Sequence, residues 1–201
     1  ELGHRRIMPY LRHRRKNGRA VSRSLWLPFT LMHPAPHVRP GPPVLGVDIG
    51  RVIIAGGTKH ADTSFFDGTH AQRMATPPVP LALEVLAILT ERFDGRVHLI
   101  SKAGPRTQRT SLDWLAHHDF WTRTGVDEAN VAFCRERREK ADLCAARGVT
   151  HMVDDRMDVL THLEGVVAHR YLFGPQHPRT QVPEGVVRVL DWGVAADVVL
   201  P

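Results

Sequence analysis

The sequence has only two cysteines, Cys134 and Cys144, among its 201 residues, and no CxxC pair. A disulfide framework and a cysteine-ligated structural zinc site are therefore excluded, and we expect a reducing, cytoplasmic compartment. No uncharged apolar run approaches the roughly 18 residues of a transmembrane helix, so we expect no membrane partner. Aromatic residues are few, at 6%, but the hydrophobic fraction of 42% excludes wholesale disorder and is enough for a folded domain.

Acidic residues are almost absent from the first 40 positions. This stretch holds nine Lys or Arg residues and one acid, Glu1, whereas residues 41–201 hold 18 bases and 20 acids. The net charge of +6 therefore belongs to the N-terminal stretch. Six prolines between positions 28 and 43 follow its charge run, and prolines keep a chain extended. We therefore expect 1–42 to be a basic, proline-rich, poorly ordered arm.

A basic arm can contact nucleic acid through phosphates. The alternative is a charged tail with no specific partner, and the sequence favours it. No alternation of aromatic and basic residues, which would support base stacking, occurs in the arm.

From residue 44 onward, short apolar segments alternate with helical patterns. Strands are expected at 44–48, 97–100, 131–134, 151–153 and 166–173, with 52–54 continuing the first past a turn and 187–192 as an edge segment. Helices are expected at 81–93, 105–118, 138–147 and 156–163. This alternation predicts that 43–201 forms an α/β domain with a parallel, doubly wound sheet and helices on both faces.

Polar side chains stand where the predicted strands end, the edge at which open parallel sheets bind ligands. In chain order these residues are Asp48, Ser101 and Lys102, Lys140 at the start of a helix, and Asp154 and Asp155. Each has a structural alternative, because Asp and Ser often cap helices and Lys often lies on a solvated helix face. Their order at four successive elements nevertheless favours a shared site.

The residue types suit phosphoryl chemistry. Asp48 and Asp154, brought together, would form an oxygen site for a hard cation such as Mg²⁺. A carboxylate beside Mg²⁺ can attack phosphorus and form an aspartyl phosphate. Ser101 can donate to a phosphoryl oxygen, and Lys140 can neutralise charge on the nucleophile and the transferring group.

These residues resemble the four motifs of the haloacid dehalogenase superfamily, which is dominated by Mg²⁺-dependent phosphatases on a Rossmann-like fold. The resemblance covers roughly 44–174 and rests on the segments 47–53, 99–101, Lys140 and 152–156. It implies that Asp48 is the nucleophile. It also implies that Ser101, Lys102 and Lys140 hold the phosphoryl group.

By the same resemblance, the metal ligands are Asp48, the Gly50 carbonyl, Asp154 and Asp155. Asp158 is the alternative to Asp155 in a supporting role. One position departs from the commonest pattern: most phosphatases of this family carry a second Asp two residues after the nucleophile, as general acid. Here it is Gly50, which cannot transfer a proton. The sequence resembles a branch with Asp-x-Gly at this place, which also contains phosphatases.

The segment 56–80 is where the family inserts a flap or cap. Its length predicts a minimal flap and an open site. His60 or His70 could replace the missing proton donor, since histidine titrates near neutrality. The alternative, exposed loop histidines in a chain that has 13 of them, is favoured.

The sequence thus predicts a Mg²⁺-dependent phosphohydrolase acting on a small phosphorylated metabolite or nucleotide. The alternative is a catalytically weak or inactive relative that binds a phosphorylated ligand or nucleic acid, favoured by Gly50 and the arm. A nucleic-acid end phosphatase is a third hypothesis.

Overall fold

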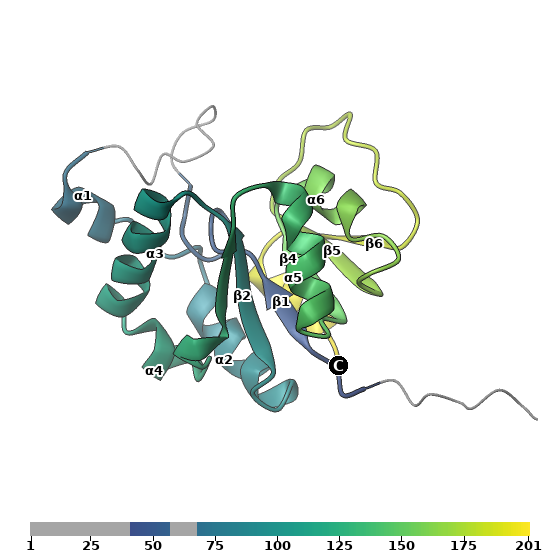
Figure 1. Ribbon diagram of the computed structural model, residues 1–201, viewed down its shortest axis with the longest axis horizontal. Helices are drawn as coiled ribbons and strands as arrows, with labels where there is room; N and C mark the ends of the chain where they lie inside the picture. The colour runs from purple at the N-terminus through teal and green to yellow at the C-terminus, as the bar shows by residue number, and fades with distance from the viewer. Residues whose placement is uncertain (1–40, 57–67) are drawn as a thin grey trace, which may run out of the picture. The chain divides into compact units, whose positions relative to one another are not determined.

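A computed structural model of the chain describes residues 41–56 and 68–201 (Figure 1). These residues all fall in the unit that runs from residue 40 to residue 201. The predicted arm lies almost wholly outside the described residues, so its character stays a prediction. Among the described residues, no helix is long and apolar enough to cross a membrane.

Six parallel strands form one sheet in the order β3-β2-β1-β4-β5-β6. The strands are β1 Leu45–Val47, β2 Val97–Lys102, β3 Val131–Cys134, β4 His151–Asp154, β5 His169–Phe173 and β6 Val186–Val189. The central strand β1 pairs with β2 on one side and β4 on the other. Chain order reverses at this strand, and in open α/β sheets ligands bind at such a switch point.

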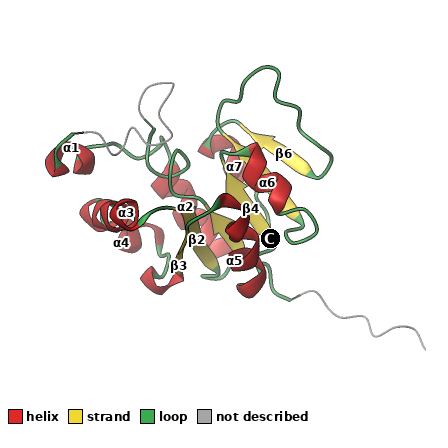
Figure 2. Cartoon of the chain, turned by 45° about the horizontal axis from the view of Figure 1, so that its top comes forward, coloured by secondary structure: helices red, strands yellow, loops and turns green. Residues whose placement is uncertain are grey.

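Helices cover both faces of the sheet, as the red ribbons of Figure 2 show. The α-helices are α1 His70–Met74, α2 Ala82–Arg92, α3 Pro105–His117, α4 Phe120–Thr124, α5 Lys140–Ala146, α6 Met157–His162 and α7 Trp192–Val198. Two 3₁₀ turns, η2 Glu128–Asn130 and η3 Arg137–Glu139, precede β3 and α5. The predicted α/β, Rossmann-like architecture is confirmed.

The two faces carry different cores. Residues of α2, α3, α4 and α7 share one buried cluster with Leu45 and Val47 of β1. Residues of α5 and α6 share the other with Ile100 of β2 and Met152 of β4. Successive side chains of a strand point to opposite faces. Asp48, in register after Val47, therefore points to the α5 side, and so does Asp154.

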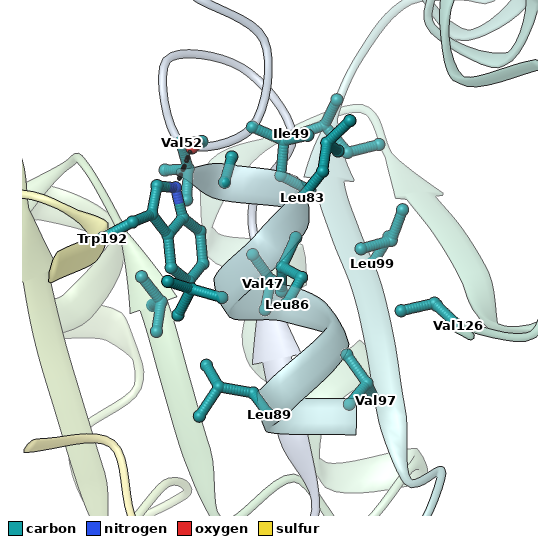
Figure 3. Close-up of a cluster of buried hydrophobic side chains, with 14 of the residues drawn as sticks. Val47, Ile49, Val52, Leu83, Leu86, Leu89, Val97, Leu99, Val126 and Trp192 are labelled. Carbon is teal, nitrogen blue, oxygen red and sulfur yellow. Dashed lines mark hydrogen bonds between the residues drawn. The ribbon is translucent and has the colours of Figure 1, made fainter. Parts of the chain in front are cut away.

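The strand predicted at 52–54 is wrong. Residues 51–53 form a turn, and Ile54 makes only isolated bridges, to Gly50 and to Pro78. A residue far along the chain stabilises this turn, because the indole N–H of Trp192 donates to the Val52 carbonyl at 2.7 Å (Figure 3). Trp192 is fully buried and begins α7.

Two other predicted elements have different bounds. The helix predicted at 138–147 begins at Lys140, because Glu139 accepts the backbone N–H groups of Arg135 and Glu136 and holds a 3₁₀ turn before it. The strand predicted at 166–173 begins at His169, after a turn that ends beyond Gly165, whose φ is 74°. The remaining predicted helices and strands agree with the structure to within a few residues.

Candidate active site

Asp48 stands one residue beyond β1, at the centre of the sheet's carboxyl edge. Its backbone N–H donates to the Val153 carbonyl at 3.0 Å, which continues the parallel pairing of β1 with β4. Its side chain is 10% exposed. The sequence builds this position by following three buried residues, Leu45–Val47, with a residue that leaves the strand toward α5.

Lys140 joins Asp48 to Asp154. Its ammonium nitrogen lies 2.9 Å from Oδ1 of Asp48 and 2.7 Å from Oδ2 of Asp154. The lysine side chain is 2% exposed. Burial lowers its pKa, but the two carboxylates outweigh that effect, so the pKa of Lys140 is raised above its usual value. Lys140 is therefore a permanent cation shared by two carboxylates.

Asp154 ends β4 and is completely buried. Besides Lys140, it accepts the backbone N–H of Arg156 at 2.9 Å through Oδ1. Burial, partly offset by Lys140 and reinforced by the charge of Asp48, raises the pKa of Asp154 to about 6. The charged form of the Asp154 carboxylate is therefore disfavoured, and an added cation nearby would stabilise it.

Asp155 forms the third carboxylate of the site. One ligand oxygen each from Asp48, Asp154 and Asp155 lie within 4.8 Å of one another. Asp155 also pairs with Arg51, whose Nε lies 3.2 Å from Oδ2. Burial and the charges of Asp48 and Asp154 raise its pKa to about 7, against the opposing effect of Arg51.

The donor set fits a hard divalent cation. It consists of three clustered carboxylates, which are the ligands that Mg²⁺ prefers. Oδ1 of Asp48 is buried and, although close to Lys140, lies outside hydrogen-bond geometry with every described donor. Among the described residues, no backbone N–H donates to the Gly50 carbonyl, the fourth predicted ligand. The site has three carboxylates but only two cationic side chains, Lys140 and Arg51, so it can accept further positive charge.

The structure separates the two residues predicted after β2 by face. Ser101 is 8% exposed, and its hydroxyl makes no hydrogen bond within the described part of the chain. Lys102 is exposed and lines a cavity together with Arg135 and Arg138 of the segment that follows β3. The contacts of the cluster therefore join Asp48, Lys140 and the Asp pair, and not Ser101 or Lys102.

Asp155 lies in the carboxylate cluster, whereas Asp158, its alternative, lies elsewhere. Asp158 lies in the first turn of α6, where it pairs with Arg156 at 3.0 Å and with Arg137 at 3.7 Å. It is outside the carboxylate cluster.

Arg51 is the site residue that sequence reasoning gave no role. It adopts a left-handed conformation with φ of 61°, which is unusual for a residue with a side chain. A Cβ on Gly56 would lie 2.9 Å from Cγ of Arg51, so this glycine makes room for the arginine. The only sequence signal was the position of Arg51 immediately after Gly50.

Of the two histidines considered as proton donors, only His70 lies among the described residues. His60 lies outside the described residues. His70 begins α1 and is exposed, and none of the contacts described for the carboxylate cluster involves it. The segment 68–80 holds α1 and its flanking loops, and the rest of the predicted flap lies outside the described residues, so its size stays a prediction.

Comparisons with known proteins give a structural likeness and no sequence match. No protein-family model and no curated protein matches the sequence. D,D-heptose 1,7-bisphosphate phosphatase from Burkholderia thailandensis is similar in structure, with a TM-score of 0.50 and 15% identity over 77% of this chain and 96% of that one. A protein described as a haloacid dehalogenase-like hydrolase, from Burkholderia xenovorans, matches with a TM-score of 0.44 and 16% identity over 62% of this chain and 58% of its own.

The first of these matches covers nearly the whole of the phosphatase chain. The resemblance read from the sequence is thus confirmed as a fold, whereas the Asp-x-Gly branch stays a prediction. The chain shares its α/β fold with this phosphatase.

Proposed function

We propose that the protein is a Mg²⁺-dependent phosphohydrolase that acts on a phosphorylated metabolite or nucleotide through an aspartyl-phosphate intermediate. One observation carries the proposal: Lys140 is buried between Asp48 and Asp154, with Asp155 alongside, at the switch point of a parallel sheet. A structural lysine would be satisfied by one carboxylate. Two carboxylates around the lysine, with a third close by, form a site that accepts additional cationic charge and an anionic substrate.

The residues that would hold Mg²⁺ are Asp48, the Gly50 carbonyl, Asp154 and Asp155. The ion would supply Lewis-acid stabilisation of charge on the phosphoryl oxygens. Arg51 pairs with Asp155 and would lie beside the bound phosphoryl group.

The chain's own residues account for the chemistry as follows. A carboxylate oxygen of Asp48 forms a bond to phosphorus while the bond from phosphorus to the leaving oxygen breaks. The leaving oxygen takes a proton from water, because Gly50 has none to give. Water then attacks the phosphorus, releases inorganic phosphate and restores the Asp48 carboxylate.

One residue assists these steps. Lys140 offsets the charge that gathers on the nucleophile and the transferring group. Ser101, predicted to hold the phosphoryl group, points to the α2 side by the alternation along β2, so the steps above do not use it. The fold shared with a solved phosphatase supports the same chemistry at this edge.

The test is phosphate release from 4-nitrophenyl phosphate and from a panel of sugar phosphates and nucleotides, with and without Mg²⁺. We expect Mg²⁺-dependent turnover that is lost in Asp48→Asn. Asp113→Asn is the matched control, since Asp113 is an exposed aspartate of α3 on the opposite face of the sheet. Equal turnover in Asp48→Asn and the control would refute the proposed nucleophile.

Gly50 favours a second candidate function, a protein that binds phosphorylated ligands or nucleic acid without turning them over. Folded protein that binds Mg²⁺ and phosphate but releases no phosphate from any compound of the panel would establish this alternative. Deleting residues 1–42 tests the arm: loss of nucleic-acid binding with intact turnover would make it an accessory element.

A further inference from the structure

A basic cavity lies at the same edge of the sheet as the candidate active site. Its volume is about 350 Å³, within the usual range of ligand sites. It is lined by the end of β2, by the segment after β3 and by α6. The basic side chains in its wall are Lys102, Arg135, Arg137 and Arg138.

The wall holds more positive charge than its acids offset. Glu136 and Asp158 are the acidic residues of the wall, and they pair with Arg138 at 2.8 Å and with Arg137 at 3.7 Å. Lys102 and Arg135 have no carboxylate within ion-pair distance among the described residues. Both are exposed. The cavity therefore presents two cations outside ion-pair distance of any described carboxylate, although Arg135, first through its backbone N–H and also through its charge, lowers the pKa of the Glu139 carboxyl.

Strand alternation places this cavity on the same face of the sheet as the nucleophile. Along β2, Val97 and Leu99 belong to the core on the α2 side, and Ile100 to the core on the α5 side. Lys102, two residues after Ile100, therefore points to the α5 side, as Asp48 does. The segment after β3 then runs directly into Lys140.

This arrangement requires a ligand with negative charge in two places. The reacting phosphoryl group is accounted for by Asp48 and Lys140, neither of which lines the basic cavity. A guanidinium and an ammonium that form no ion pair within 4.0 Å among the described residues suit a phosphate, since the arginine fork can bind two of its oxygens at once.

We propose that the cavity is a second anion subsite, and that the substrate is a small molecule with a second phosphate at a distance from the one that is hydrolysed. The proposal rests on the proposed phosphohydrolase function. Lys102 and Arg135 hold the second phosphate, which orients the substrate before Asp48 attacks.

The experiment compares linear alkanediols of increasing chain length, each as its monophosphate and its bisphosphate. The wild-type protein is expected to show a higher kcat/KM for the bisphosphate at one range of chain lengths. Lys102→Gln and Arg135→Gln should each lower the ratio of kcat/KM for bisphosphate over monophosphate by about 10-fold or more, as charged hydrogen bonds typically do. The matched control, Arg109→Gln, replaces an exposed arginine of α3 on the opposite face and should keep the wild-type ratio.

A binding measurement separates this proposal from the proposed function. Calorimetry with alkane bisphosphonates, which cannot be hydrolysed, should show affinity that falls in Lys102→Gln and Arg135→Gln even if the protein turns nothing over. Equal kcat/KM for both members of every pair, or a preference that both variants retain, would overturn the proposal. Preferred turnover of a 5′-phosphorylated oligonucleotide over every bisphosphate would also overturn it, in favour of nucleic acid.

Discussion

Replacing Lys140 by methionine tests the electrostatic core of the site. The substitution keeps an unbranched side chain of similar length and removes the charge together with the hydrogen bond that the ammonium donates to Asp154. Each of the two ion pairs, at 2.9 and 2.7 Å, is worth a gross attraction of about 6 kcal/mol at an effective dielectric constant of about 20. Part of that attraction offsets the cost of burying the ammonium, which is several kcal/mol. Removing one partner of a buried ion pair usually costs about 3–5 kcal/mol, because uncompensated charge remains.

The pH dependence gives this prediction its sign. Without the lysine, the pKa of Asp154, which burial already raises to about 6, rises further above its unfolded value. A carboxyl whose folded pKa is raised loses stability as pH rises through the interval between the unfolded and folded values. The stability deficit of Lys140→Met should therefore be largest near pH 8 and smaller near pH 5, where the carboxylates bind protons. Mg²⁺ should recover part of it at pH 8.

The assay is urea unfolding followed by tryptophan fluorescence, at both pH values, with and without Mg²⁺. Lys102→Met is the control, since Lys102 is an exposed lysine at the same sheet edge without a described ion pair. A deficit below about 1 kcal/mol, or one equal at pH 5 and pH 8, would refute the reasoning that Lys140 compensates buried carboxylates.

Three further predictions concern other parts of the domain. Gly50 has open space around its missing Cβ, so Gly50→Asp should be accommodated and should raise turnover of alkyl phosphates about 10-fold or more relative to 4-nitrophenyl phosphate, by supplying a general acid; an unchanged ratio in steady-state assays would contradict this. Trp192→Phe leaves the buried Val52 carbonyl without its donor and should lower unfolding stability by about 1–3 kcal/mol, measured by urea unfolding followed by far-UV circular dichroism; a loss under about 0.5 kcal/mol would speak against an anchoring role. Burial and the neighbouring His169 lower the pKa of His151 to about 4. The contribution of neutral His151 to the free energy of unfolding is therefore complete above pH 6.5 and is lost as pH falls toward 4. The stability difference between wild type and His151→Gln should therefore shrink over that interval in unfolding titrations, and a constant difference would show that His151 does not titrate there.

The regular part of the fold could be predicted from sequence because its signals are local. The strand 131–134 and the helix 105–118 follow from apolar runs and from Pro105 at a helix start, and both agree with the structure to within one residue. The strand predicted at 52–54 was wrong because a distant contact, and not the local apolar run, determines the conformation of these residues. Trp192, 140 residues away, fixes Val52 in a turn.

The site likewise has residues that the sequence pattern predicts and contacts that depend on the folded chain. Asp48, Lys140 and the Asp pair were predictable, because parallel topology brings the carboxyl ends of strands to one edge. The contact of Arg51 with Asp155 depends on a left-handed backbone and on the space left by Gly56, neither of which a residue pattern encodes. The basic cavity likewise depends on how α6 packs beside the segment after β3.

The account's central claim is that Asp48 carries the phosphoryl group. Mass spectrometry of protein rapidly quenched in acid during turnover of 4-nitrophenyl phosphate tests it directly. The account predicts the mass of one phosphoryl group on the peptide that contains Asp48, dependent on Mg²⁺ and absent from Asp48→Asn. Turnover with the label on another residue, or with undiminished rate in Asp48→Asn, would contradict it.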